Sequence, residues 1–79
     1  MGDVYKTSDI LLASCLKIDG HQMTAIEVEG NKGTFVFSHV PDQYLIEYDL
    51  GNLKVEPVSF NNMVKQLTTS VRRMTQRDK

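Results

Sequence analysis

The sequence predicts an α+β fold: a small antiparallel sheet, built on a central β-hairpin, with an N-terminal helix and a long C-terminal helix packed on one face. Residues 23–40 have the pattern of two short strands folded back on a tight turn. An apolar helical segment precedes the hairpin, and from residue 57 onward apolar side chains recur along one side of a helix. The 79 residues suffice for one domain, predicted to span residues 1–79.

The composition is that of an ordinary globular domain. The formal net charge of −1 gives no bulk electrostatic reason to expect nucleic acid or a membrane as partner. The single cysteine, Cys15, has no partner for an internal disulfide, so we expect a reducing, cytoplasmic setting. The first residues lack the basic and apolar regions of a signal peptide, and the longest apolar-rich stretch, residues 10–18, is too short to span a membrane.

The N-terminal part predicts a short strand followed by a helix. Residues 4–7 are extended in character and are predicted to pair with an edge of the hairpin as a third strand. The hydroxyl of Thr7 or Ser8 is expected to cap a helix over about residues 8–18, with Asp9 in its first turn. Apolar residues cover most of the circumference of this helix, so we expect it to be largely buried.

The hairpin is predicted to consist of strands at about residues 23–29 and 34–39. Between them, Gly30-Asn31-Lys32-Gly33 carries the turn signal, because glycine and asparagine tolerate the positive φ angles of tight hairpin turns. We take Asn31 and Lys32 as the two loop residues.

This choice of loop sets the strand register. Val28 is then opposite Phe35, and Ile26 is opposite Phe37, on the face that we expect to be buried. Sliding one strand by one residue would place Glu27 opposite Phe35 and mix charged with apolar side chains. A buried face therefore favours the first register.

Residues 43–52 support two interpretations. Every second residue from Tyr44 to Leu50 is large and apolar or aromatic, as in a strand, and residues 53–56 would complete a second hairpin. Pro41 and the acidic residue after it, with a glycine at position 51, instead fit a short helix at about residues 42–50. We adopt the helix, mainly because of a family resemblance.

The C-terminal helix, predicted at about residues 58–75, has the clearest amphipathic pattern. Its apolar side chains fall within about 100° of arc, and polar side chains cover the other side. The apolar stripe consists of Phe60, Met63, Val64, Leu67, Val71 and Met74. The predicted core of the domain is Leu11, Leu12, Cys15, Leu16, Ile26, Val28, Phe35, Phe37, Phe60, Val64, Leu67 and Val71.

Five short motifs occur along the chain: Tyr5-Lys6-Thr7-Ser8-Asp9, Leu12-Ala13-Ser14, Gly20-His21, Phe35-Val36-Phe37 and Val55-Glu56-Pro57-Val58-Ser59-Phe60-Asn61-Asn62. In this order and at these spacings they resemble a small bacterial and phage domain family of unknown function. The resemblance covers nearly the whole chain. It implies a helix between the hairpin and the Val-x-Pro segment, and an origin in bacteria, phages or integrated phage elements. It implies no activity, substrate or catalytic residue.

No set of residues predicts catalysis, a metal site or a cofactor site. His21 and His39 fall at the open end of the hairpin, without further ligands at a characteristic metal spacing. Cys15 lies on the buried side of a helix, where a thiol is inert. Thr7-Ser8-Asp9 is explained by helix capping. We therefore expect a chain that is not an enzyme.

The most informative functional signal is positive charge near the C-terminus. Residues 61–79 have a net charge of +4, whereas residues 1–60 have −5. The candidate contacts to nucleic acid or to a partner are Lys65, Arg72, Arg73 and Arg77. A solvated helix face explains the same pattern, and this segment has no aromatic residue for base stacking.

We expect a non-enzymatic accessory or protein-interaction module, bound to an unidentified protein partner or to a second copy as a homodimer. The hairpin edge or the C-terminal helix would form the dimer. The alternative is a phage- or mobile-element-associated nucleic-acid-binding protein that uses the basic helix. Tyr44, Tyr48, Val36 and Met23 form either an exposed patch for a partner or, if residues 43–50 are assigned wrongly, part of the core.

Overall fold

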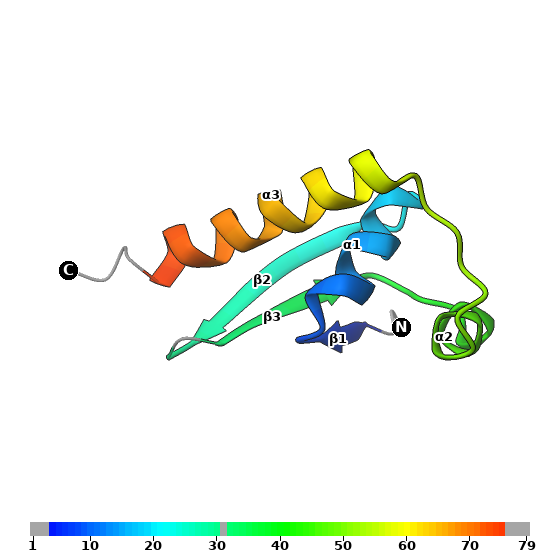
Figure 1. The fold of residues 1–79 in the computed structure, drawn as a ribbon. Coiled ribbons are helices and arrows are strands. Elements are labelled where there is room, and N and C mark those ends of the chain that lie inside the picture. Colours follow the sequence, from blue (N-terminus) through cyan, green and yellow to red (C-terminus); the bar gives the residue numbers. More distant parts are fainter. Residues whose placement is uncertain (1–3, 31, 76–79) are drawn as a thin grey trace.

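The computed structural model describes residues 4–30 and 32–75, and it has the predicted α+β architecture (Figure 1). A three-stranded antiparallel sheet contains the predicted hairpin, and the N-terminal and C-terminal helices pack against each other. In chain order the elements are β1 (Tyr5–Thr7), α1 (Ile10–Ile18), β2 (Met23–Glu29), β3 (Lys32–Phe37), α2 (Asp42–Asp49) and α3 (Pro57–Thr75).

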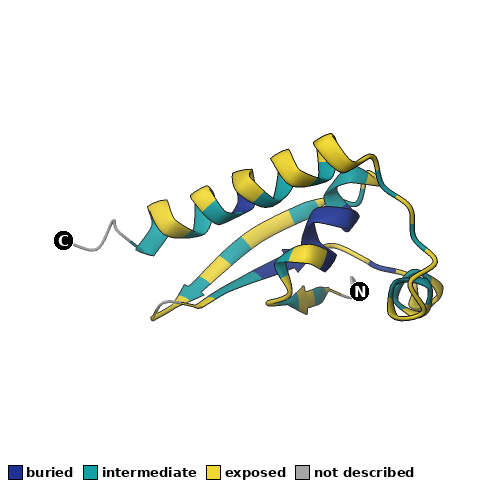
Figure 2. Cartoon of the chain, in the orientation of Figure 1, coloured by how far each residue is buried: buried dark blue, intermediate teal, exposed yellow. Residues whose placement is uncertain are grey.

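Strand β1 is the predicted third strand, and the strand order is β1-β3-β2. Tyr5 lies opposite Phe37, and Thr7 lies opposite Phe35. Strand β3 is therefore central, with a neighbour along each edge. Its last three residues are all buried, which makes β3 the most deeply covered strand (Figure 2).

Val36 is buried although the sequence pattern places it on the polar outer face. It is only 6% exposed. On that face Lys6 of β1 and Glu27 of β2 form an ion pair of 3.5 Å between Nζ and Oε1, which spans the central strand. The long stems of these charged side chains can cover apolar surface while their ends stay in water.

The predicted hairpin register is wrong by two residues. Ile26 lies opposite Phe35, and Val28 lies opposite Gly33. Because side chains alternate with a period of two, this slip keeps Ile26, Val28 and Phe35 on their predicted face. A register shift between Met23 and Ala25 breaks the alternation near the start of β2, where Met23 lies opposite Phe37. The turn explains the difference: Gly30 has φ +64°, whereas the predicted loop would have required a positive φ at a lysine. Asn31 lies outside the described residues.

Helix α1 begins two residues later than predicted and has a different cap. Oδ1 of Asp9 accepts hydrogen bonds from the backbone N–H groups of Leu11 (3.0 Å) and Leu12 (3.3 Å). The expected hydroxyl cap is wrong, since Thr7 Oγ1 instead accepts from the N–H of Asp9 (3.1 Å). The carboxylate of Asp9 satisfies two free N–H groups and places negative charge at the positive end of the helix.

Helices α1 and α2 end in the same hydrogen-bonded motif around a glycine. Gly20 has φ +93°, and the N–H of His21 donates to the carbonyl of Leu16 (2.9 Å). Gly51 has φ +75°, and the N–H of Asn52 donates to a carbonyl five residues earlier (2.9 Å). Both are Schellman endings, for which a left-handed glycine is the usual solution. Residues 42–49 are thus helical, and the alternative strand interpretation of this segment is wrong.

Helix α3 begins at Pro57. Proline is favoured at the first position of a helix, because an N–H group there would have no partner within the helix and its absence costs nothing. Glu56 caps the helix by accepting from the N–H groups of Val58 (3.2 Å) and Ser59 (2.7 Å), and these bonds lower the pKa of its carboxyl. Only Leu67 of the apolar stripe is fully buried. None of the helices in residues 4–30 and 32–75 is long and apolar enough to cross a membrane.

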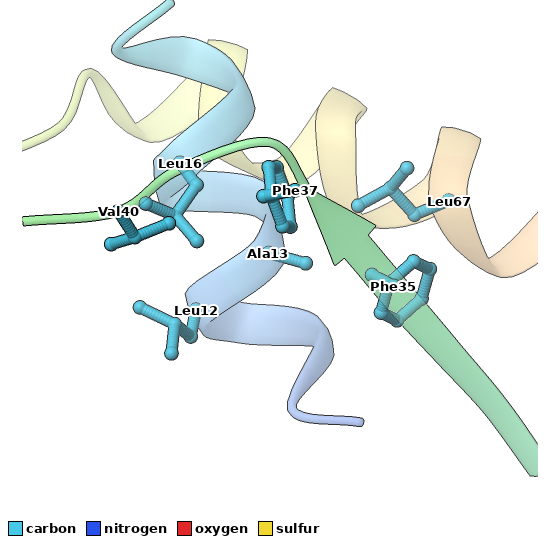
Figure 3. Close-up of a cluster of buried hydrophobic side chains, with 7 residues drawn as sticks. All are labelled: Leu12, Ala13, Leu16, Phe35, Phe37, Val40 and Leu67. Atoms are coloured by element: carbon cyan, nitrogen blue, oxygen red, sulfur yellow. The ribbon is translucent and has the colours of Figure 1, made fainter. Parts of the chain in front are cut away.

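The core lies between α1, β3 and α3 (Figure 3). Its buried apolar side chains form one cluster of Leu12, Ala13, Leu16, Phe35, Phe37, Val40 and Leu67. Leu11 was expected in this core, but it is 47% exposed. The helix turns it about 100° from its buried neighbour Leu12, which takes it off the buried side. The predicted core residues Ile26, Val28, Phe60, Val64 and Val71 are half-buried.

The C-terminal half of α3 packs directly on the hairpin at Gly33. A Cβ atom at this position would lie 2.7 Å from Cγ2 of Val71. Valine is stiff at χ1, so its side chain cannot readily move aside. Glycine is therefore required here by a close approach of α3.

We expect Gly33→Ala to lower the free energy of unfolding by about 1–3 kcal/mol, the usual cost of overpacking. In the Gly33→Ala/Val71→Ala double variant the clash is absent, so the combined cost should be clearly smaller than the sum of the single costs. Chemical denaturation of the four proteins measures this coupling. Additive costs would show that Val71 does not limit the space at Gly33.

Candidate functional site

Two tyrosines of α2 connect this helix to both ends of α1. The hydroxyl of Tyr44 donates to Oδ2 of Asp19 (2.6 Å), just after α1, and the hydroxyl of Tyr48 donates to Oδ2 of Asp9 (3.0 Å), just before it. We call these four residues the tyrosine clamp. Helix α2 has no fully buried residue (Figure 2). Long side chains, rather than close backbone packing, hold it in place.

The two tyrosines of the clamp hold their protons more tightly than free phenols do. Burial and the hydrogen bond to Asp9 raise the pKa of Tyr48 to about 12. Burial and the hydrogen bond to Asp19 raise the pKa of Tyr44 well above its ordinary value. Both phenols are therefore neutral donors near neutral pH. They would be poor general bases there.

Cys15 and the two histidines lie in three different environments. Cys15 is buried, and its thiol pKa is raised by this burial and by the carboxylates of Asp19 and Asp9, so the thiol stays protonated. His21 packs edge-on against Tyr44, with 5.0 Å between the ring centroids. His39 is exposed and borders a separate hollow of about 580 Å³ near β1 and the start of α2.

The described residues contain no group of three or more histidine, cysteine or acidic side chains that could hold a metal ion. The clamp does bring acidic, phenolic and thiol groups near one another, but each has a structural use. Asp9 both caps α1 and binds Tyr48. Asp19 binds Tyr44 beside the end of α1.

A groove of about 370 Å³ lies between the N-terminal end of α1, strand β3 and the C-terminal half of α3. We call it the α1–α3 groove. Ile10, Phe35 and Val71 give it an apolar floor, and Arg72 is the only charged residue among the described residues that line it. Its other lining residues are Ser8, Gly33, Thr68 and Thr75. The groove is thus apolar and hydroxyl-rich, with one cation at its border.

Three of the four predicted basic contact residues lie exposed on α3: Lys65, Arg72 and Arg73. Arg77 lies outside the described residues. Within the part of the chain that the structure describes, the one ion pair is Lys6–Glu27, so these three cations have no ionic partner there. They are the only charged residues of α3, which gives this helix a net charge of +3.

The patch considered for Tyr44, Tyr48, Val36 and Met23 does not exist. Val36 is buried, and the other three are half-buried against the core cluster. Among the described residues, the large apolar side chains that are exposed lie elsewhere: Ile46 is on α2, and Leu50 directly follows the last residue of this helix. The remaining exposed ones are Val4, Leu11 and Val58.

Sequence reasoning missed both the clamp and the groove. One signal of the clamp is present in the sequence: the two tyrosines are four residues apart, so they share one side of a helix. Their acidic partners are 25 and 39 residues away, and only the fold brings them together. No family model, curated protein or solved structure matches this chain.

The raised pKa of Tyr48 predicts a pH dependence. The folded chain holds the phenolic proton more tightly than the unfolded chain, so this contribution to stability is complete below pH about 10 and is lost as the pH rises through about 12. Ultraviolet titration of tyrosinate should show a step near pH 12 that is missing in Tyr48→Phe. Between these pH values, the free energy of unfolding should also fall less steeply in Tyr48→Phe. A Tyr48 that titrates near pH 10 in the folded protein would contradict the clamp.

Proposed function

We propose that this chain is a non-enzymatic protein-interaction module that self-associates, with the α1–α3 groove as its interaction surface. One observation carries the proposal: in the groove the half-buried side chains of Ile10 and Val71 expose apolar surface beside the buried Phe35. Apolar surface exposed in a concave site is typical of a binding site for a partner. In a domain this small, a second copy would also add stability that a single small core supplies sparingly.

The apolar stripe of α3 supports the same proposal. Apart from Leu67, its members are only half-buried. Removing further apolar surface from water is worth roughly 25 cal/mol per Å² before the costs of association. A partner seated against the C-terminal half of α3 would gain this contribution.

The surroundings of the reactive side chains favour an interaction module over an enzyme. Tyr44 and Tyr48 are neutral donors with raised pKa values, and Cys15 is buried with a raised pKa. Each of them packs or holds an element of the fold. A free thiol kept this way also suits the reducing, cytoplasmic setting that we propose.

Self-association should appear at micromolar concentration in sedimentation velocity and equilibrium experiments. Thr68 lines the groove, and Thr69 is its exposed neighbour on another side of α3. We expect Thr68→Glu to raise the dissociation constant at least about tenfold, equivalent to about 1.4 kcal/mol, because it puts a charge into an apolar contact.

Thr69→Glu is the matched control, since it changes the charge of α3 equally but lies outside the groove lining, and it should associate like the wild type. Circular dichroism verifies that both variants are folded. A wild type that stays monomeric at high concentration would contradict the homodimer.

A second candidate function, nucleic-acid binding, is favoured by the three exposed cations of α3. Lys65 and Arg72 are seven residues apart, so they lie two turns apart on one side of the helix, within reach of successive phosphates. If this function is correct, fluorescence anisotropy should show binding to DNA or RNA at low salt.

Arg72→Glu/Arg73→Glu should abolish this binding, whereas Lys17→Glu/Lys54→Glu makes the same charge change outside α3 and outside the hairpin that its C-terminal half contacts, and should retain most of it. Absence of binding at low salt would exclude this candidate.

A further inference from the structure

We infer that the α1–α3 groove receives helix α2 of a second copy of this chain. This inference rests on the proposed function and names the partner segment of the same site. It follows from the charges, the exposed apolar residues and the positions of the two surfaces on one molecule.

Helices α2 and α3 have opposite and equal charges. The charged residues of α2 are Asp42, Glu47 and Asp49, a net charge of −3. The charged residues of α3 give +3. In residues 4–30 and 32–75 no ion pair neutralises either helix. Such complementary surfaces steer association and fix its orientation.

The outer side of α2 carries an apolar pair that suits the groove. Ile46 is 49% exposed and Leu50 is 66% exposed. They are four residues apart, and Leu50, which directly follows the last residue of α2, keeps near-helical backbone angles, so the two are neighbours on one surface. An amphipathic helix that lays such a pair into an apolar groove is a recurring mode of recognition. The half-buried Ile10 and Val71 in the floor of the groove would cover them.

The occupant must come from another molecule. The tyrosine clamp turns Tyr44 and Tyr48 of α2 towards α1, and leaves Ile46 and Leu50 exposed. In Figure 1, α2 lies at one end of the molecule, beyond β1, whereas the C-terminal half of α3 lies at the other end. The acidic helix of one chain therefore cannot reach the groove of the same chain in this fold.

The size of the contact favours a two-fold dimer. Helix α2 has eight residues and is thus about 12 Å long. One such helix in a groove buries far less surface area than the roughly 800 Å² that each partner buries in a standard interface. A two-fold dimer would use the contact twice, with each α2 in the groove of the other copy.

Charge reversal tests the inference on the full chain by sedimentation equilibrium. Arg72→Glu/Arg73→Glu changes the net charge of α3 to −1, and Glu47→Lys/Asp49→Lys changes that of α2 to +1. We expect each double variant to raise the dissociation constant of the dimer at least about tenfold. The chain with all four substitutions should recover most of the affinity, because its two helices are again complementary.

The apolar part of the contact has its own test with a matched control. Leu50→Ser removes an exposed side chain at the C-terminal end of α2, and Val58→Ser removes a side chain of nearly the same exposure, 65%, at the start of α3. Leu50→Ser should weaken the dimer at least about tenfold, and Val58→Ser should leave it unchanged. Both side chains are largely in solvent, so neither change should prevent folding.

The possible results separate this inference from the proposed function. A wild-type dimer that all these variants leave intact would overturn the inference, while self-association itself would stand. A wild type without self-association would overturn both. Assembly of the wild type into species larger than a dimer would contradict the two-fold arrangement.

Discussion

Helix α1 is apolar around most of its circumference, and the rest of the fold is arranged to cover it. Five consecutive residues, Leu12 to Leu16, are buried. The sheet covers one side, α3 another, and the tyrosines of α2 a third. Ala13 and Ser14 are small, which allows close packing. The buried hydroxyl of Ser14 donates to the carbonyl of Ile10 (2.8 Å), so it costs little to bury.

The surfaces that we propose as functional follow from how unequally these elements cover one another. Helix α3 has 19 residues and α1 has nine, so α3 extends well beyond α1. Its C-terminal half contacts the hairpin at Gly33, and the α1–α3 groove lies between this half and the N-terminal end of α1. Helix α2, in contrast, is held by the ends of two tyrosine side chains, which leaves its other side free. One molecule thus has an uncovered apolar groove beside positive charge, and an uncovered acidic helix with an apolar pair.

Much of the fold could be predicted from the sequence, but little of the candidate site could. The spacing of Leu67 and its neighbours predicts α3, and alternation predicts which hairpin residues face the core. The slip of the register by two residues shows the limit: both registers bury Ile26 and Phe35, so the pattern alone does not distinguish them. The clamp and the groove join residues from separate elements. No local pattern of Tyr44, Ser8 or Thr68 indicates their neighbours.

The sequence by itself determined where most of the elements lie and most of the faces that they bury, because backbone preferences and hydrophobic periodicity act within a few residues of the chain. For residues 43–50 the local pattern fitted a strand and a helix alike. Gly20 and Gly51 end helices, and Pro57 begins one, for such local reasons. The tertiary structure decided the burial of Val36, the exposure of Leu11, the use of Asp9 as both cap and clamp, and the close approach at Gly33. These four features depend on contacts between residues that are distant in the chain, and such contacts form only when the helices pack against the sheet.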